Sequence, residues 1–180
     1  MALVFVDVEA HFNSPCPNIG DGMTEFGAIE FESRKWFHGG LDQWATSEYP
    51  AWNDCSIEER GPWYEVFIVF EQWLHQFKPP YIFVSDNPAY DWQWINYHFH
   101  KELRRNPFGW SARRIGDFYA GLVGDFRAAS KWKKLRITKH THMPVDDAMG
   151  NVESFYSILT SLKLALNNDT FIPLKVTSHG

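Results

Sequence analysis

The stretch Leu3-Val4-Phe5-Val6-Asp7-Val8-Glu9 decides the fold class of this chain. It consists mainly of β-branched and aromatic residues, a composition typical of a strand. Side chains of a strand alternate between its two faces, so Asp7 and Glu9 project from the same face. Burying two carboxylates in an apolar strand costs free energy unless a countercharge lies nearby, and divalent cations would supply one. The alternative is that both acids lie on a solvent-facing side or at a strand end.

The elements predicted around this strand alternate between sheet and helix. Residues 24–32 partly alternate and predict a second strand, antiparallel to the first across a Pro- and Gly-rich loop at 14–22. The other expected elements are a possible strand early in 33–56, a helix start at Ser56–Glu59, a helix over 63–77, a strand over 81–84, helices over 89–100, 111–129 and 146–166, and a strand or loop at 135–137.

This order indicates one α/β domain over residues 1–180, with helices packed on a mixed sheet. A hydrophobic share of 44%, with 9 Trp, 7 Tyr and 15 Phe, excludes a disordered chain. Cys16 and Cys55 are too few for a disulfide framework and lack metal-ligand spacing, which favours a reduced, cytoplasmic setting. The chain does not begin like a signal peptide, and no apolar run approaches the ~18–20 residues of a membrane span.

Charge is distributed unevenly along the chain. The net charge is −5, but residues 101–140 contain eleven Lys and Arg against three acids. A local basic stripe of this kind can bind phosphates even when the whole protein is acidic. The alternative is a solvated, lysine-rich helix face.

Two later segments carry further acids at predicted helix starts. Asp91 lies in the first turn of the helix after the strand over 81–84, whereas Asp86 is better explained as a turn residue. Asp146 and Asp147 also lie at a helix start, where capping alone explains at least one of them. His142 precedes Asp147 by five residues and is a candidate proton acceptor.

The three segments together resemble a known family. They are similar to the three motifs of the DEDDh 3′–5′ exonucleases, with Asp7-x-Glu9 as the first, Asn87-x-x-x-Asp91 as the second and His142-x-x-x-x-Asp147-Ala148 as the third. In chain length and general sequence character, the chain is similar to the small RNase T-like exoribonucleases. The resemblance extends from Asp7 to about residue 166. The histidine at 142 is similar to the DEDDh form and not to the variant that has tyrosine.

The resemblance implies an RNase H-like fold and a hydrolytic mechanism with two metal ions. Asp7, Glu9, Asp91 and Asp147 would hold two Mg²⁺ or Mn²⁺ ions, and His142 would act as general base. The expected products are nucleoside 5′-monophosphates released from the 3′ end of single-stranded RNA. The resemblance also implies a possible homodimer.

Further residues are expected to contact the substrate through stacking, phosphate binding or the terminal nucleotide. They are Ala10, Phe12, Asn87, Trp92, Trp94, Arg113 and Arg114. Ala10 and Met143-Pro144 depart from the residues frequent in the family, although neither change removes a catalytic group. For the aromatic residues the alternative is a place in the core, above all for Trp94. Three other functions stay open: a DNA exonuclease, a non-catalytic nucleic-acid-binding module, and an interaction protein that uses the tryptophans from 36 to 63.

Overall fold

The fold was analysed in a computed structural model that describes residues 1–10, 22–41 and 57–167. Its elements in chain order are β1 (Ala2–Ala10), β2 (Met23–Glu30), β3 (Trp36–Gly40), β4 (Ile57–Arg60), α1 (Trp63–Leu74), β5 (Tyr81–Ser85), α2 (Pro88–His98), a π-helical turn η2 (Phe99–Leu103), β6 (Ala112–Arg114), α3 (Ile115–Val123), the short 3₁₀ helices η3 (Phe126–Ala128) and η4 (Lys131–Leu135), and α4 (Pro144–Asn167).

The strands form one mixed sheet with the order β4-β3-β2-β1-β5-β6. The pairs β1–β2 and β2–β3 are antiparallel, and the other three neighbouring pairs are parallel. The antiparallel pairing of the first two predicted strands is therefore confirmed. The possible strand early in 33–56 is present as β3, and the predicted α/β class with a mixed sheet is confirmed.

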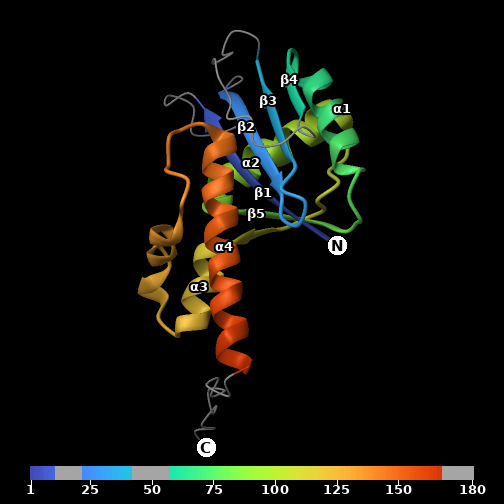
Figure 1. The fold of residues 1–180 in the computed structure, drawn as a ribbon. Coiled ribbons are helices and arrows are strands. Elements are labelled where there is room, and N and C mark those ends of the chain that lie inside the picture. Colours follow the sequence, from blue (N-terminus) through green and yellow to red (C-terminus); the bar gives the residue numbers. More distant parts are fainter. Residues whose placement is uncertain (11–21, 42–56, 168–180) are drawn as a thin grey trace, which may run out of the picture.

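Helices cover both faces of this sheet (Figure 1). α4 runs along one face, while α1 and α2 pack on the other. Successive residues of β1 point to opposite faces, so Val4 and Val6 enter the core beneath α1 and α2, and Phe5 enters the core beneath α4. Asp7 and Glu9 follow Phe5 by two and four residues, so they lie on the same face of β1 as Phe5. Their side chains therefore face α4.

The predicted helix start at Ser56–Glu59 is wrong, because Ile57–Arg60 is the edge strand β4. This strand pairs in parallel with β3, and Ile57 packs against the apolar cluster beneath α1. The helix begins only at Trp63, after Gly61 and Pro62, and buries Val66, Phe67, Phe70, Trp73 and Leu74. Each of these side chains contributes about 1.5–3 kcal/mol through removal from water.

The predicted helix over 111–129 is too long. Ala112–Arg114 instead forms β6 beside β5, and α3 ends where Gly124 adopts a left-handed conformation with φ +68°. Residues 135–137 are not a strand: Leu135 ends η4, and an irregular segment follows it. The helices predicted over 89–100 and 146–166 are confirmed as α2 and α4.

The remaining predictions at this level are not decided by the fold. The loop expected at 14–22 falls almost entirely outside the described residues. Among the described residues, no helix combines the length and apolar composition that a bilayer span requires. The single domain, the homodimer and the cytoplasmic setting stay predictions.

Candidate functional site

The close approach of α4 to the sheet depends on a glycine opposite Asp7. In the β1–β2 register, Asp7 lies across from Gly27 and Glu9 lies across from Glu25. A Cβ atom at Gly27 would lie 2.4 Å from the carbonyl carbon of Pro144 and 2.4 Å from the nitrogen of Val145. The first turn of α4 therefore contacts the backbone of β2, which only glycine permits. This contact brings the start of α4 beside the two acids of β1.

The structure separates the two neighbouring aspartates at the start of α4. The side chain of Asp147 points back to the preceding segment and accepts hydrogen bonds from the backbone N–H groups of Thr141 at 3.0 Å and His142 at 3.1 Å. Only 1% of its surface is exposed. Asp146 instead accepts a hydrogen bond from the Thr141 hydroxyl on the outer side. Asp147, and not Asp146, therefore joins the acids of β1.

Asp91 approaches the acids of β1 from α2, which packs on the other face of the sheet. It lies in the first turn of α2, which begins with Pro88, and its Oδ1 accepts a hydrogen bond of 3.2 Å from the Val8 backbone N–H. Val8 separates Asp7 from Glu9 in β1, so this bond joins the start of α2 to the Asp-x-Glu segment. Asp86, the competing acid, instead pairs with Lys133 at 2.6 Å and with a second cation from the same segment.

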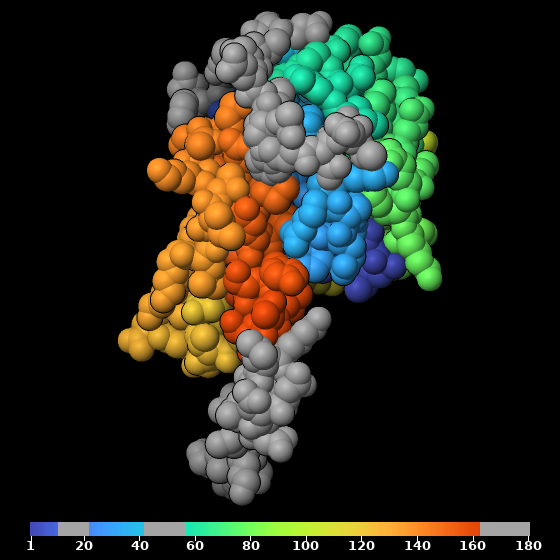
Figure 2. All heavy atoms as spheres, in the orientation of Figure 1, coloured from blue at the N-terminus to red at the C-terminus, as the bar shows by residue number. Residues whose placement is uncertain are grey.

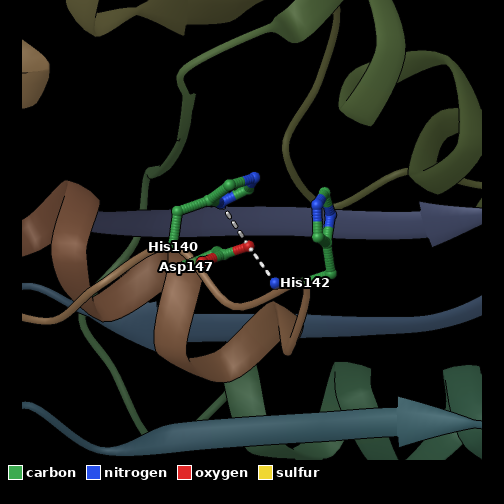
Figure 3. Close-up of side chains that lie close together, drawn as sticks. All are labelled: His140, His142 and Asp147. Atoms are coloured by element: carbon green, nitrogen blue, oxygen red, sulfur yellow. Dashed lines mark hydrogen bonds and ion pairs between the residues drawn. The ribbon is translucent and has the colours of Figure 1, made fainter.

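Two histidines surround the Asp147 carboxylate (Figure 3). His142 has a left-handed backbone with φ +62°, and its Nδ1 lies 3.5 Å from Oε1 of Glu9. The Nδ1 of His140 lies 2.6 Å from Oδ2 of Asp147. The centroids of the two imidazole rings are 4.4 Å apart. The predicted proton acceptor is thus next to the acids, and a second imidazole accompanies it.

Burial and mutual repulsion raise the pKa values of Asp7, Glu9 and Asp91. The pKa of Asp7 is well above its usual value, first because of burial and then because of the negative charges of Asp91 and Asp147. Burial likewise raises the pKa of Asp91, with Asp86 as the next cause. Burial raises the pKa of Glu9 to about 7, although the neighbouring His142 opposes this shift.

The donor atoms of the cluster fit a hard divalent cation. Carboxylate oxygens of Asp7, Glu9 and Asp147 lie within 4.8 Å of one another. Among the described residues, Oδ2 of Asp91 is buried and has no hydrogen-bond partner. Mg²⁺ and Mn²⁺ take oxygen ligands of this kind, and a bound cation would supply the countercharge that the buried acids require.

These pKa shifts predict that the metal-free protein loses stability as the pH rises from about 4.5 to about 7. Within this window the folded state holds a proton on Glu9 that the unfolded chain has released, so the unfolding free energy falls. Thermal unfolding in EDTA should show this loss of stability as a decrease in Tm of about 2–4 °C for each kcal/mol of unfolding free energy lost. Glu9→Gln, which cannot ionise, should lose Tm less steeply with pH. A wild-type Tm no more pH-dependent than that of Glu9→Gln would contradict this assignment.

The predicted stacking residues have different positions. Trp94 is fully buried in the core beneath α1 and α2, so the prediction that it stacks on a base is wrong. Trp92 is half-buried with its ring edge-on to Phe83, at 5.1 Å between centroids. Ala10 ends β1, one residue after Glu9. Phe12 lies outside the described residues.

The polar substrate-contact candidates lie near the start of α2. Asn87 and Arg114 line one hollow of about 450 Å³ together with Asp117, which pairs with Arg114 at 3.1 Å. Arg113 is exposed on the edge strand β6, where its guanidinium donates to the hydroxyl of Ser111. Several cations of the basic stretch pair with acids in the same way, so its positive charge is partly neutralised.

Three residues near the acids were not found from the sequence. The sequence did not identify His140, although the His-x-His spacing of His140 and His142 could have indicated a pair. Glu25, opposite Glu9, is bound by His38 at 2.8 Å, and only the strand register reveals this position. Tyr90 lies half-buried next to Asp91, and burial together with the charge of Glu9 raises its pKa.

Known proteins resemble this chain in sequence and in fold. No family model matches it. The 3′–5′ DNA exonuclease Cap18 of Escherichia coli is 23% identical over 164 residues, which cover 85% of this chain and 84% of that protein. The nuclease domain of 3′hExo, a DEDDh family member solved with bound rAMP, superposes with a TM-score of 0.59 and 13% identity over 89% of this chain and 92% of that one. Cell-death related nuclease 4 (CRN-4) superposes with a TM-score of 0.60 and 12% identity over 89% and 64%.

The fold is thus the RNase H-like fold of these nucleases, as the sequence predicted. The similarity to Cap18 covers most of both chains, and the acids of all three motif segments meet at one place. The chain therefore shares the fold of these nucleases and is similar in sequence to a 3′–5′ DNA exonuclease.

Proposed function

We propose that this protein is a metal-dependent 3′–5′ exonuclease that releases nucleoside 5′-monophosphates from single-stranded nucleic acid. The observation that carries the proposal is the meeting of acids from β1, α2 and α4 beside an exposed histidine. Buried acids with raised pKa values, such as Asp7 and Asp91, are typical of a functional site. The comparisons support the same class of reaction.

In this proposal Asp7, Glu9, Asp91 and Asp147 hold two Mg²⁺ or Mn²⁺ ions. When bound, the cations would make a water more acidic and would stabilise the negative charge on the leaving 3′-oxygen. The protein places these four acids on rigid elements, two of them on the central strand and two in the first turns of helices. The Thr141 and His142 backbone amides orient Asp147, and the Val8 amide orients Asp91.

His142 is proposed as the general base. Its imidazole is 72% exposed, so substrate and water can reach it, while Nδ1 faces Glu9. The imidazole would accept the proton of the attacking water while the water oxygen bonds to phosphorus. The bond from phosphorus to the 3′-oxygen of the preceding nucleotide breaks in the same reaction. A positioned general base of this kind typically accelerates a reaction by about 10²–10⁴-fold.

RNA is the substrate that the family resemblance implies, and we propose it as the first candidate. DNA is the second, because the curated relative that is similar over 85% of this chain is a DNA exonuclease. The two substrates differ at the 2′-hydroxyl, which a protein can recognise directly. Both candidates share a single strand with a free 3′ end.

The decisive experiment uses oligonucleotides of several lengths, as RNA and as DNA, each with a free and with a blocked 3′ end. Chromatography after incubation with Mg²⁺ or Mn²⁺ should show 5′-monophosphates from the free-end substrates, and faster release identifies the preferred sugar. Intact free-end substrates with both metals would overturn the enzyme proposal. Binding of these oligonucleotides without turnover would favour the non-catalytic module.

A further inference from the structure

His140 gives this site a second set of donor atoms that the exonuclease reaction does not require. One nitrogen from each of His140 and His142 and one oxygen of Asp147 lie within 4.8 Å of one another. Figure 3 shows the two imidazoles on either side of the Asp147 carboxylate. The set combines two nitrogens and one oxygen, whereas the set of Asp7, Glu9 and Asp147 contains oxygens alone.

The backbone holds this second set in place before any ion binds. Asp147 accepts hydrogen bonds from the N–H groups of Thr141 and His142, so the carboxylate anchors the segment that carries both imidazoles. The left-handed conformation of His142 is sparsely populated for a non-glycine residue, and these bonds support it. Residues 139–142 are exposed, and the orange segment ahead of α4 lies at the molecular surface, so an ion can enter from solvent (Figure 2).

The geometry suits a borderline cation better than it suits Mg²⁺. Zn²⁺ binds imidazole nitrogen and carboxylate oxygen at about 2.0–2.2 Å, commonly with three protein ligands and one open position. Two tetrahedral donors at that distance lie about 3.3 Å apart. The 2.6 Å between His140 Nδ1 and Asp147 Oδ2 must therefore widen by less than 1 Å. The side chain of His140 is 50% exposed, so its ring has room to move.

We propose that His140, His142 and Asp147 form a second cation site, selective for Zn²⁺ over Mg²⁺, which overlaps the exonuclease site at Asp147. Zn²⁺ in this site occupies the lone pair of His142 and competes for the Asp147 carboxylate. Bound Zn²⁺ therefore inhibits turnover even when Mg²⁺ is present. The inhibition rests on the proposed exonuclease function, whereas the binding of Zn²⁺ does not.

Calorimetric titration of ZnCl₂ into tag-free protein in millimolar Mg²⁺ tests the binding. We expect one Zn²⁺ to bind wild type, and the affinity of His140→Gln to fall by at least about tenfold. His75→Gln is the matched control, because it removes an exposed histidine of α1's C-terminal end and should leave the affinity unchanged. Equal Zn²⁺ affinity in wild type and a folded His140→Gln would overturn the proposal.

NMR of the histidine rings gives a readout that does not depend on a variant. The ring signals of His140 and His142 should shift together on addition of one equivalent of Zn²⁺ and should not do so with Mg²⁺. Unshifted signals at Zn²⁺ saturation would overturn the site. If the protein binds Zn²⁺ but degrades no oligonucleotide, the second site stands and the exonuclease proposal fails. If it degrades oligonucleotides but does not bind Zn²⁺, the exonuclease proposal stands and the second cation site fails.

Discussion

Replacing Asp147 with alanine is expected to abolish turnover, whereas Asp146→Ala should leave an active enzyme. Asp147 is buried, and its carboxylate meets those of Asp7 and Glu9, so its loss removes a proposed cation ligand as well as the hydrogen bonds that anchor the segment before α4. Stabilisation by a catalytic metal amounts to several kcal/mol, so the rate should fall by at least about a thousandfold. The measurement is the initial rate of 5′-monophosphate release at saturating Mg²⁺.

Asp147→Asn distinguishes loss of the cation ligand from loss of structure. The Thr141 and His142 amides donate to different oxygens of Asp147, so the asparagine carbonyl oxygen can keep one of the two hydrogen bonds, whereas alanine keeps neither. Asp147→Asn should therefore be more stable than Asp147→Ala and still lose turnover. Asp146 accepts a hydrogen bond from the Thr141 hydroxyl on the outer side, away from the acids of β1, and its substitution should change the rate little. An inactive Asp146→Ala beside an active Asp147→Ala would move the last ligand by one position.

The second large effect is expected from Gly27→Ala, a change of one methyl group. The new Cβ would lie 2.4 Å from backbone atoms of Pro144 and Val145, so α4 must move away from β2. Overpacking of this kind typically costs about 1–3 kcal/mol. Because the displaced turn carries Asp147, turnover should fall together with the unfolding free energy. Urea unfolding and the rate of 5′-monophosphate release measure the two effects.

Gly121→Ala is the matched control for this substitution. Gly121 lies in α3, and a Cβ there would meet no atom within 4 Å. Alanine in a helix interior is more favourable than glycine by about 0.8–1.0 kcal/mol, so this variant should be as stable as wild type or more stable. A Gly27→Ala protein with wild-type stability and rate would show that α4 does not depend on close contact with β2.

The candidate acids could be predicted because local patterns identify them. Strand alternation placed Asp7 and Glu9 on one face, and positions after a strand or at a helix start indicated Asp91 and Asp147. Capping gave an equally good local explanation for Asp146. The two aspartates are distinguished only by the segment before α4, whose backbone N–H groups at Thr141 and His142 donate hydrogen bonds to Asp147.

Errors arose where pairing with distant residues overrides local preference. Ile57–Arg60 has the local pattern of a helix start, but β3 offers it a parallel strand partner. Ala112–Arg114 was predicted to be part of a helix, but it pairs with β5 as a strand. Trp94 lies one helical turn after Asp91 on the same buried face of α2, and there its ring enters the core beneath α1 and α2.

The sequence by itself determined the α/β class, the hairpin of β1 and β2, and the three segments that carry acids and His142. Hydrophobic periodicity and residue chemistry are local properties, and they are sufficient for these conclusions. Only the tertiary structure decided which aspartate joins the acids, that Glu25 lies opposite Glu9, and that His140 contacts Asp147. The approach of α4 over Gly27 joins atoms more than a hundred residues apart in the chain, and strand register pairs residues on separate strands. No local pattern encodes such contacts.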